Sequence, residues 1–131
     1  MDVKVLIDTS VWIAFFRGQD HELIERIAAL LKSGRAVYTG IIALELINGA
    51  KGQKELTVLN EAFDAMQHIP VAETTFLLAG KLGYGIARKG HTLSAVDLLI
   101  AQTAIENNLS LMTFDEHFVM ISKHSSLTIF R

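Results

Sequence analysis

Apolar residues along this chain fall into two kinds of pattern. Short runs rich in β-branched residues, such as Val3–Ile7, predict buried strands of a parallel sheet. Between such runs, apolar residues recur every three or four positions, which predicts helices with one buried face. One such face consists of Leu23, Ile24, Ile27, Leu30 and Leu31. The pattern therefore alternates between strand and helix along the chain.

Turn and capping residues divide this pattern into elements. We expect strands at 3–7, 36–39, 68–72, 109–114 and 127–130. We expect helices at 11–16, between Asp20 and Gly34, and at 41–47, 56–66, 73–89, 94–107 and 116–121. The run 41–47 also fits a strand, but its Ala, Leu and Glu content favours a helix. Gly83 and Gly85 leave open a break in the long helix 73–89.

This alternation is typical of a three-layer α/β/α fold with a mainly parallel central sheet. The chain has 131 residues, which fits one domain spanning residues 1–131 without repeats or a linker. Half of the residues are hydrophobic, which is the upper end of the range for a soluble domain. These hydrophobic residues either fill a compact core or form part of a surface that binds a second chain, and both interpretations stay open.

Composition also limits where the protein acts and what it binds. Its formal net charge is −2, which is not the electrostatic footprint of a protein that holds nucleic acid through a broad basic face. The absence of cysteine excludes disulfides and thiolate metal sites, and is compatible with a reducing cytoplasm. The N-terminus has no signal-peptide layout, and no apolar run reaches the roughly 20 residues of a membrane span. We therefore expect a cytoplasmic protein that does not associate with membranes.

Three acidic residues stand alone in apolar surroundings. Asp8 directly follows VKVLI, Glu45 lies inside IIALELI, and Asp97 lies inside AVDLLIA. An ionised carboxylate in an apolar stretch is costly unless something compensates its charge. Each has an ordinary explanation: Asp8 as a helix N-cap, Glu45 as an outward helix position, and Asp97 as a first-turn acid that favours the helix dipole. Taken singly, none of them establishes a functional site.

The predicted topology brings these acids together. Asp8 ends the first strand, and Asp115 follows the strand 109–114, so both lie at the carboxyl edge of a parallel sheet. Asp97 begins the helix before that strand, and helix starts lie at the same edge. Glu45 is early in the helix after the second strand, which also starts from that edge. We therefore expect four carboxylates at one crevice.

Carboxylates packed this closely repel one another unless a cation compensates them. No Lys or Arg is adjacent in sequence to Glu45 or Asp97. Oxygen ligands without cysteine favour Mg²⁺ or Mn²⁺. Such ions activate water for attack on a phosphodiester and stabilise the negative charge that develops on the phosphate. The predicted chemistry is therefore metal-dependent phosphodiester hydrolysis by Asp8, Glu45, Asp97 and Asp115.

Two hydroxyl residues flank these acids. Ser10 and Thr113 lie beside Asp8 and Asp115 in the sequence, where they are positioned to hydrogen-bond a metal ligand or a water. Routine capping by Ser10 and strand packing of Thr113 are the alternatives.

Three segments together resemble a known family. They are DTSVWIAFF at 8–16, ALELINGA at 43–50 and GHTLSAVDLLIAQTAIENNLSLMTFDEHF at 90–118. They resemble the PIN-domain ribonucleases, in particular the VapC-type toxins of type II toxin–antitoxin pairs. The resemblance spans nearly the whole chain. Its most specific part is the pair Asp97 and Asp115, in which the second follows the first by 18 residues.

The resemblance implies more than the spacing does. It implies a PIN-like fold, Mg²⁺- or Mn²⁺-dependent endonucleolytic cleavage of RNA, a homodimer, and inhibition by a cognate antitoxin whose C-terminal segment lies near the active site. It also assigns the four acids of that site to Asp8, Glu45, Asp97 and Asp115. The family usually has a Gly in the turn before the strand LSLMTF, where this chain has Asn107-Asn108. Because Asn also tolerates the left-handed conformation, we expect no functional change.

Basic residues and histidines add little to this hypothesis. Arg17, Arg88 and Lys89 are candidates for contacts with RNA phosphates or with an acidic antitoxin residue, but ordinary surface charge is the simpler interpretation. The histidines show no paired metal-ligand spacing, so we interpret them as surface or loop residues. They are His21, His68, His91, His117 and His124. His117 is the nearest of them to the predicted site in sequence.

Two other classes of function are weaker. A catalytically silent PIN-fold module that binds protein or RNA would not need all four acids, and all four are present. A phosphate-transfer domain would carry D-x-D-x-T after the first strand, whereas Asp8 is followed by Thr9-Ser10-Val11. A receiver-type domain would also place a Lys at the end of a late strand, and residues 113–116 contain none.

Overall fold

Five short parallel strands form the centre of the fold in the computed structural model, which describes residues 2–131. The strands are β1 (Val5–Ile7), β2 (Ala36–Tyr38), β3 (Gln67–His68), β4 (Ser110–Met112) and β5 (Thr128–Ile129). The helices are α1 (Thr9–Arg17), α2 (His21–Lys32), α3 (Gly40–Asn48), α4 (Gln53–Ala65), α5 (Glu73–Ala87), α6 (Ala95–Glu106) and α7 (Glu116–Lys123). The predicted α/β fold class is confirmed.

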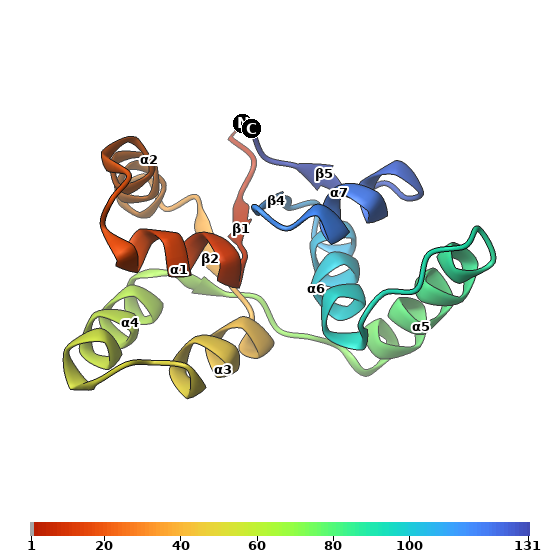
Figure 1. Ribbon diagram of the computed structural model, residues 1–131, viewed down its shortest axis with the longest axis horizontal. Coiled ribbons are helices and arrows are strands. Elements are labelled where there is room, and N and C mark those ends of the chain that lie inside the picture. Colours follow the sequence, from red (N-terminus) through yellow and green to blue (C-terminus); the bar gives the residue numbers. More distant parts are fainter. Residues whose placement is uncertain (1) are drawn as a thin grey trace.

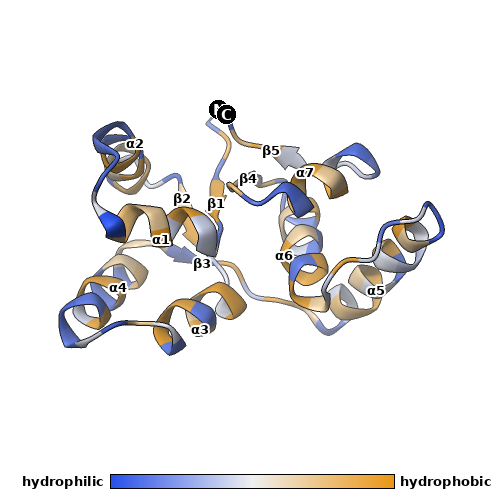
Figure 2. Ribbon diagram, viewed as in Figure 1, coloured by the Kyte–Doolittle hydropathy of each residue, from blue (hydrophilic) through white to orange (hydrophobic). Residues whose placement is uncertain are grey.

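The central strands are covered on both faces. Every residue of β1 and β4 is buried, and successive residues of a strand point to opposite faces, so helices must pack on both. Figure 1 shows α1–α4 gathered around β1 and β2, α6 and α7 beside β4 and β5, and α5 on the outer side of α6. The largest fully buried side chains, Trp12 and Phe118, come from α1 and α7. Figure 2 shows the corresponding apolar colour along β1.

The strand order creates one switch in chain direction across the sheet. Its order is β3-β2-β1-β4-β5, and every neighbouring pair is parallel. The chain therefore moves outward from β1 to β3, crosses back, and continues from β4 to β5 on the other side. In such sheets a crevice forms where the direction changes, beyond the carboxyl ends of the strands. Here the two strands that flank this point are β1 and β4.

All the predicted elements are present with shifted bounds, for example α4 at Gln53–Ala65 instead of 56–66, and two of the differences have a clear physical reason. The strand expected at 68–72 is shorter and earlier, at Gln67–His68, because Pro70 lacks the N–H that a continued ladder needs. The helix expected at 73–89 runs from Glu73 to Ala87 without a break. Gly83 lies against α6 rather than at a kink: a Cβ there would lie 2.4 Å from Leu98 Cδ1, so the Leu98 side chain would have to shift. Within residues 2–131, no helix is long and apolar enough to cross a bilayer.

Candidate active site

Asp8 lies at the junction between β1 and α1. Its backbone N–H donates to Met112 O of β4 at 2.9 Å, which continues the β1–β4 pairing one residue beyond the end of β1. Its Oδ2 accepts hydrogen bonds from the hydroxyls of Ser10 at 2.8 Å and Thr113 at 3.0 Å. It also caps the first turn of α1 through Ser10 N. Asp8 is therefore both the N-cap expected from local sequence and a residue tied to the opposite side of the crevice.

The environment of Asp8 disfavours its negative charge. Only 5% of the residue is exposed. Burial raises the pKa of the Asp8 carboxyl above its ordinary value of 3.8, while the hydrogen bonds from Ser10, Thr113 and the backbone act in the opposite direction. A cation beside Asp8 would favour the ionised form.

Hydroxyl groups connect Asp8 to Asp115. The Thr113 hydroxyl that donates to Asp8 also accepts from the backbone N–H of Asp115 at 3.0 Å. The Ser10 hydroxyl similarly accepts from Phe114 N at 3.1 Å while donating to Asp8. The loop after β4 is thereby fixed to the end of β1. Ser10 and Thr113 thus orient the Asp8 carboxylate and hold the segment that carries Asp115.

Asp97 and Asp115 each begin a helix at this edge. Asp97 lies in the first turn of α6, where its N–H donates to Ser94 Oγ at 3.1 Å. Asp115 caps α7 by accepting from His117 N at 2.9 Å. Asp8 caps the start of α1 in the same way, so each of these three carboxylates lies at the N-terminus of a helix. The helix dipoles partly offset the mutual repulsion of these acids.

His117 joins this group of acids, which the sequence did not indicate. Its Nδ1 lies 3.4 Å from Asp97 Oδ2 and 3.5 Å from Asp115 Oδ1. Asp97, Asp115 and His117 each offer one ligand atom within 4.8 Å of the others. The sequence predicts that His117 is a surface residue, and 65% of its side chain is exposed. The signal available in the sequence was its place two residues after Asp115, in the first turn of α7.

Glu45 reaches the site from a different helix. It lies in the middle of α3, and its Oε1 accepts a hydrogen bond from the Thr9 hydroxyl at 2.9 Å. Thr9 is the first residue of α1, directly after Asp8. Glu45 is thus tied to the residue beside Asp8, while it lies outside the group formed by Asp97, Asp115 and His117.

Nothing with a permanent positive charge neutralises these acids. Across residues 2–131, the ion-pair contacts of Asp97 and Asp115 are with His117 alone, and Asp8 and Glu45 have none. An acidic group at the carboxyl edge of a parallel sheet, with helix N-termini behind it and no Lys or Arg in contact, is suited to a divalent cation. The matching family model is the PIN domain, and it spans residues 5–123. The chain belongs to the PIN-domain family.

Individual relatives agree with this membership, and the resemblance inferred from sequence is confirmed. The PIN-domain chain is 28% identical to Ribonuclease VapC11 of Mycobacterium tuberculosis (strain H37Rv) over 127 residues, which cover 94% of this chain and 95% of that one. It is 30% identical to Ribonuclease VapC1 of Methanocaldococcus jannaschii over 116 residues, covering 88% and 79%.

Solved structures share the fold. DNA-bound VapBC from Salmonella typhimurium superposes with a TM-score of 0.80 at 20% identity, covering 98% of each chain. VapBC-1 from nontypeable Haemophilus influenzae superposes with a TM-score of 0.76 at 23% identity, covering 96% of each. These PIN folds therefore have the same three-layer architecture as this one.

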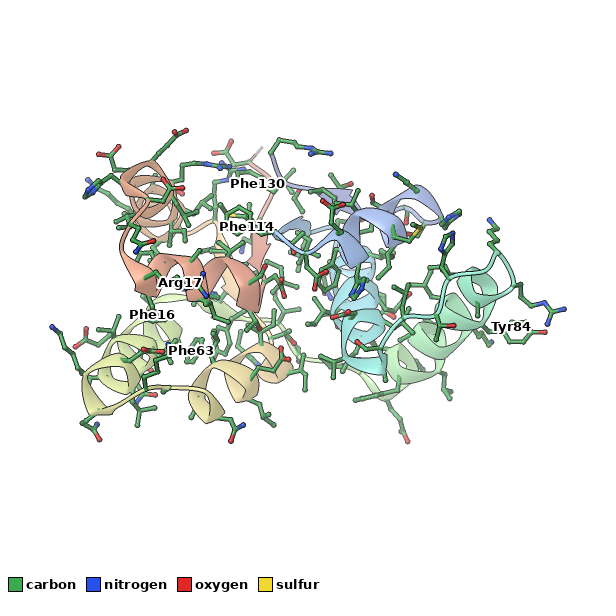
Figure 3. The ribbon with its side chains drawn as sticks, viewed as in Figure 1. Phe16, Arg17, Phe63, Tyr84, Phe114 and Phe130 are labelled. Atoms are coloured by element: carbon green, nitrogen blue, oxygen red, sulfur yellow. The ribbon has the colours of Figure 1, made fainter. Side chains whose placement is uncertain are left out.

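The basic residues considered from sequence lie at helix ends. Arg17 is the last residue of α1, about 12 Å along the helix from its start. Arg88 follows α5 and stacks on Tyr84, with its guanidinium carbon 5.4 Å from the ring centroid, and Lys89 is exposed beside it. Figure 3 labels Arg17 and Tyr84 at separate parts of the PIN domain. These side chains therefore make no contact with the acidic group.

Proposed function

We propose that this chain, as one PIN domain over residues 1–131, is a metal-dependent endoribonuclease acting in the cytoplasm as the toxin of a VapBC-type pair. The observation that carries the proposal is the convergence of Asp97 and Asp115 beside the Asp8–Thr113 bond at the switch point of a PIN fold. The relatives named ribonucleases cover most of both chains, which supports the same activity here. The lack of cysteine suits a reducing compartment.

The residues present fit a hard divalent cation, Mg²⁺ or Mn²⁺. Asp8, Asp97 and Asp115 offer carboxylate oxygens from three elements, and we assign Glu45 to the same ion site through its position beside Thr9. When bound, the cation supplies Lewis-acid activation of water and stabilises charge on the phosphate. Ser10 and Thr113 hold the Asp8 carboxylate in one orientation, and the N-termini of α1, α6 and α7 favour negative charge at this edge.

An exposed aromatic ring beside the acids supports RNA as the substrate. Phe114 lies between Thr113 and Asp115 and is 56% exposed, although its backbone is fixed by the bond to Ser10. Figure 3 shows Phe114 on the loop between β4 and α7. Proteins that bind single-stranded RNA stack unpaired bases on such rings. Because Phe114 adjoins Asp115 in this loop, a base stacked on its ring would hold an RNA strand at the loop that carries Asp115.

A groove near α1 fits an antitoxin segment. It is lined by Phe16 of α1 and by residues at the start of α4: Lys51, Gly52, Lys54, Glu55 and Val58. Apolar side chains flanked by two lysines suit a segment that is both apolar and acidic. We assign this groove to the cognate antitoxin. The VapBC complexes of similar fold support such a partner.

The outer surface of α5 supports a homodimer. Four large apolar side chains on this helix are exposed: Phe76, Leu77, Leu78 and Tyr84. Between α5 and α6 lies a cavity of about 240 Å³ whose lining, including Phe76, Val96 and Leu99, is almost wholly apolar. Several exposed apolar side chains on one helix are a feature of interaction surfaces rather than of monomers. A second copy of the chain, presenting the same surface, would cover it.

Purified protein tests the activity directly. We expect cleavage of RNA with Mg²⁺ or Mn²⁺ and none after the cation is removed with excess chelator, with activity restored by adding the ion back. Mapping the cleaved ends on total RNA would show internal cuts. Cleavage that persists in excess chelator would contradict the metal-dependent mechanism.

A further inference from the structure

His117 gives the acidic group a nitrogen atom that a Mg²⁺ site does not need. Its backbone N–H is held by Asp115 Oδ1 at 2.9 Å, which fixes the start of its side chain. Its Nδ1 then lies 3.4 Å from Asp97 Oδ2 and 3.5 Å from Asp115 Oδ1. The imidazole is therefore anchored next to both carboxylates even though it is largely exposed.

These separations are compatible with ligands of one ion. Two ligand atoms bound to one tetrahedral ion at about 2.0–2.1 Å lie about 3.3–3.4 Å apart. The Nδ1–Oδ separations of 3.4 and 3.5 Å lie close to that spacing, and the exposed imidazole can adjust its position. One imidazole and two carboxylates are also a ligand set suited to Zn²⁺, with the fourth position open.

We propose that Asp97, Asp115 and His117 form a zinc site that competes with the catalytic cation for the same two carboxylates. This inference rests on the proposed function, because Asp97 and Asp115 belong to both sites. Zn²⁺ binds mixed nitrogen and oxygen ligands more tightly than Mn²⁺ does, and Mg²⁺ prefers oxygen alone. Zinc therefore displaces the catalytic cation at low concentration and inhibits RNA cleavage.

The His117 side chain is open to solvent. It is 65% exposed, and it borders a cavity of about 350 Å³ between the loop Gly90–Leu93 and the outer side of α7. Asp97 and Asp115 do not line this cavity, so it adjoins the imidazole rather than the carboxylates. Solvent therefore reaches His117 from the side of the cavity.

Cobalt and zinc titrations of His117→Gln test the site without relying on activity. Tetrahedral Co²⁺ absorbs strongly in the visible, so we expect bands with the unaltered protein that His117→Gln greatly weakens. We also expect the Kd for Zn²⁺, measured by calorimetry, to rise at least about tenfold. His21→Gln is the matched control, since His21 is also an exposed histidine in the first turn of a helix, α2. The control should keep the spectrum and the zinc affinity.

A second variant separates this inference from the proposed function. Asp8 is outside the Asp97–Asp115–His117 group, so Asp8→Asn should keep the cobalt spectrum while losing RNA cleavage. An unchanged spectrum and zinc Kd in His117→Gln would overturn the zinc site but leave metal-dependent cleavage intact. Conversely, cleavage by Asp8→Asn at the unaltered rate would contradict the proposed active site and leave the zinc site standing. Thermal midpoints of all variants show whether each is folded.

Discussion

The Thr113 hydroxyl donates to Asp8 Oδ2 at 3.0 Å, across 105 positions of sequence. The same oxygen of Thr113 accepts from the N–H of Asp115 at 3.0 Å, so one side chain positions an acid on each side of the crevice. Neither bond exists unless β1 and β4 are neighbours in the sheet. The active-site geometry is thus coupled directly to the strand order.

Thr113→Val removes this hydroxyl while keeping the shape of the side chain. We expect metal affinity to fall roughly 10–100-fold, because Asp8 and Asp115 lose the group that orients both. The free energy of unfolding should fall by about 1–3 kcal/mol, since Asp8 loses one of its donors. Calorimetric titration with Mn²⁺ and denaturant unfolding measure the two effects.

Thr128→Val is the matched control for that substitution. Thr128 is an exposed residue of the edge strand β5, so its replacement should change neither metal affinity nor stability appreciably. If Thr113→Val bound Mn²⁺ as tightly as the control, Thr113 would be a packing residue without influence on the acids.

Asp97→Asn is expected to abolish RNA cleavage while leaving the thermal midpoint equal or higher. The capping bond at this position comes from the backbone N–H to Ser94, so the amide side chain keeps it. Replacing one carboxylate also removes repulsion from Asp115. Thermal unfolding and an RNA cleavage assay on the same preparation test both parts. Asp64→Asn, on the exposed surface of α4, should match the unaltered protein in both. An unfolded Asp97→Asn variant would instead make Asp97 a structural residue.

Position along the chain was sufficient to predict much of the acidic group. Asp8 ends an apolar strand and Asp97 begins an apolar helix, and parallel topology sends both to one edge. These cues are local, because they depend on which residue follows a strand or starts a helix. The placement of Asp115 needed the same rule together with the position of β4 beside β1.

What sequence reasoning missed depends on contacts between distant elements. The Thr9–Glu45 hydrogen bond exists because α1 packs against α3, and no local pattern encodes that approach. His117 is exposed and lacks a second histidine at ligand spacing, so it has the appearance of an ordinary surface residue. The sequence leaves open a helix break at Gly83, whereas α5 continues through it and packs there against Leu98 of another helix. Each of these required the tertiary arrangement.

The raised pKa of Asp8 predicts a specific pH dependence of stability. The folded protein keeps the Asp8 proton at pH values where the unfolded chain has already lost it, so protonated Asp8 contributes to the free energy of unfolding. This contribution is fully present below about pH 3.8, the ordinary pKa, and is lost as the pH rises through the raised pKa of the folded state. In the Asp8→Asn variant the side-chain amide does not ionise, so no charge is buried at any pH. We therefore expect it to be more stable than the unaltered protein near neutral pH, with the difference shrinking under acid conditions.

Denaturant unfolding across this pH range, without added metal, measures that difference. Adding Mg²⁺ at neutral pH should stabilise the unaltered protein more than Asp8→Asn, because the ion binds the folded state through the ionised carboxylate. A difference in stability that stays constant with pH would show that Asp8 carries the same protonation in the folded and unfolded chains.

Leu77→Glu tests the assignment of the α5 surface to a homodimer. Leu77 is 68% exposed, so a charge there should not disturb the fold of one chain, whereas two such charges facing each other would destabilise a dimer. We expect the variant to sediment as a monomer at concentrations where the unaltered protein is a dimer. Thr57→Glu adds the same charge to an exposed position of α4 and should leave the dimer intact. If Leu77→Glu stayed dimeric, the second copy would have to bind elsewhere, and the apolar side chains of α5 would face a different partner.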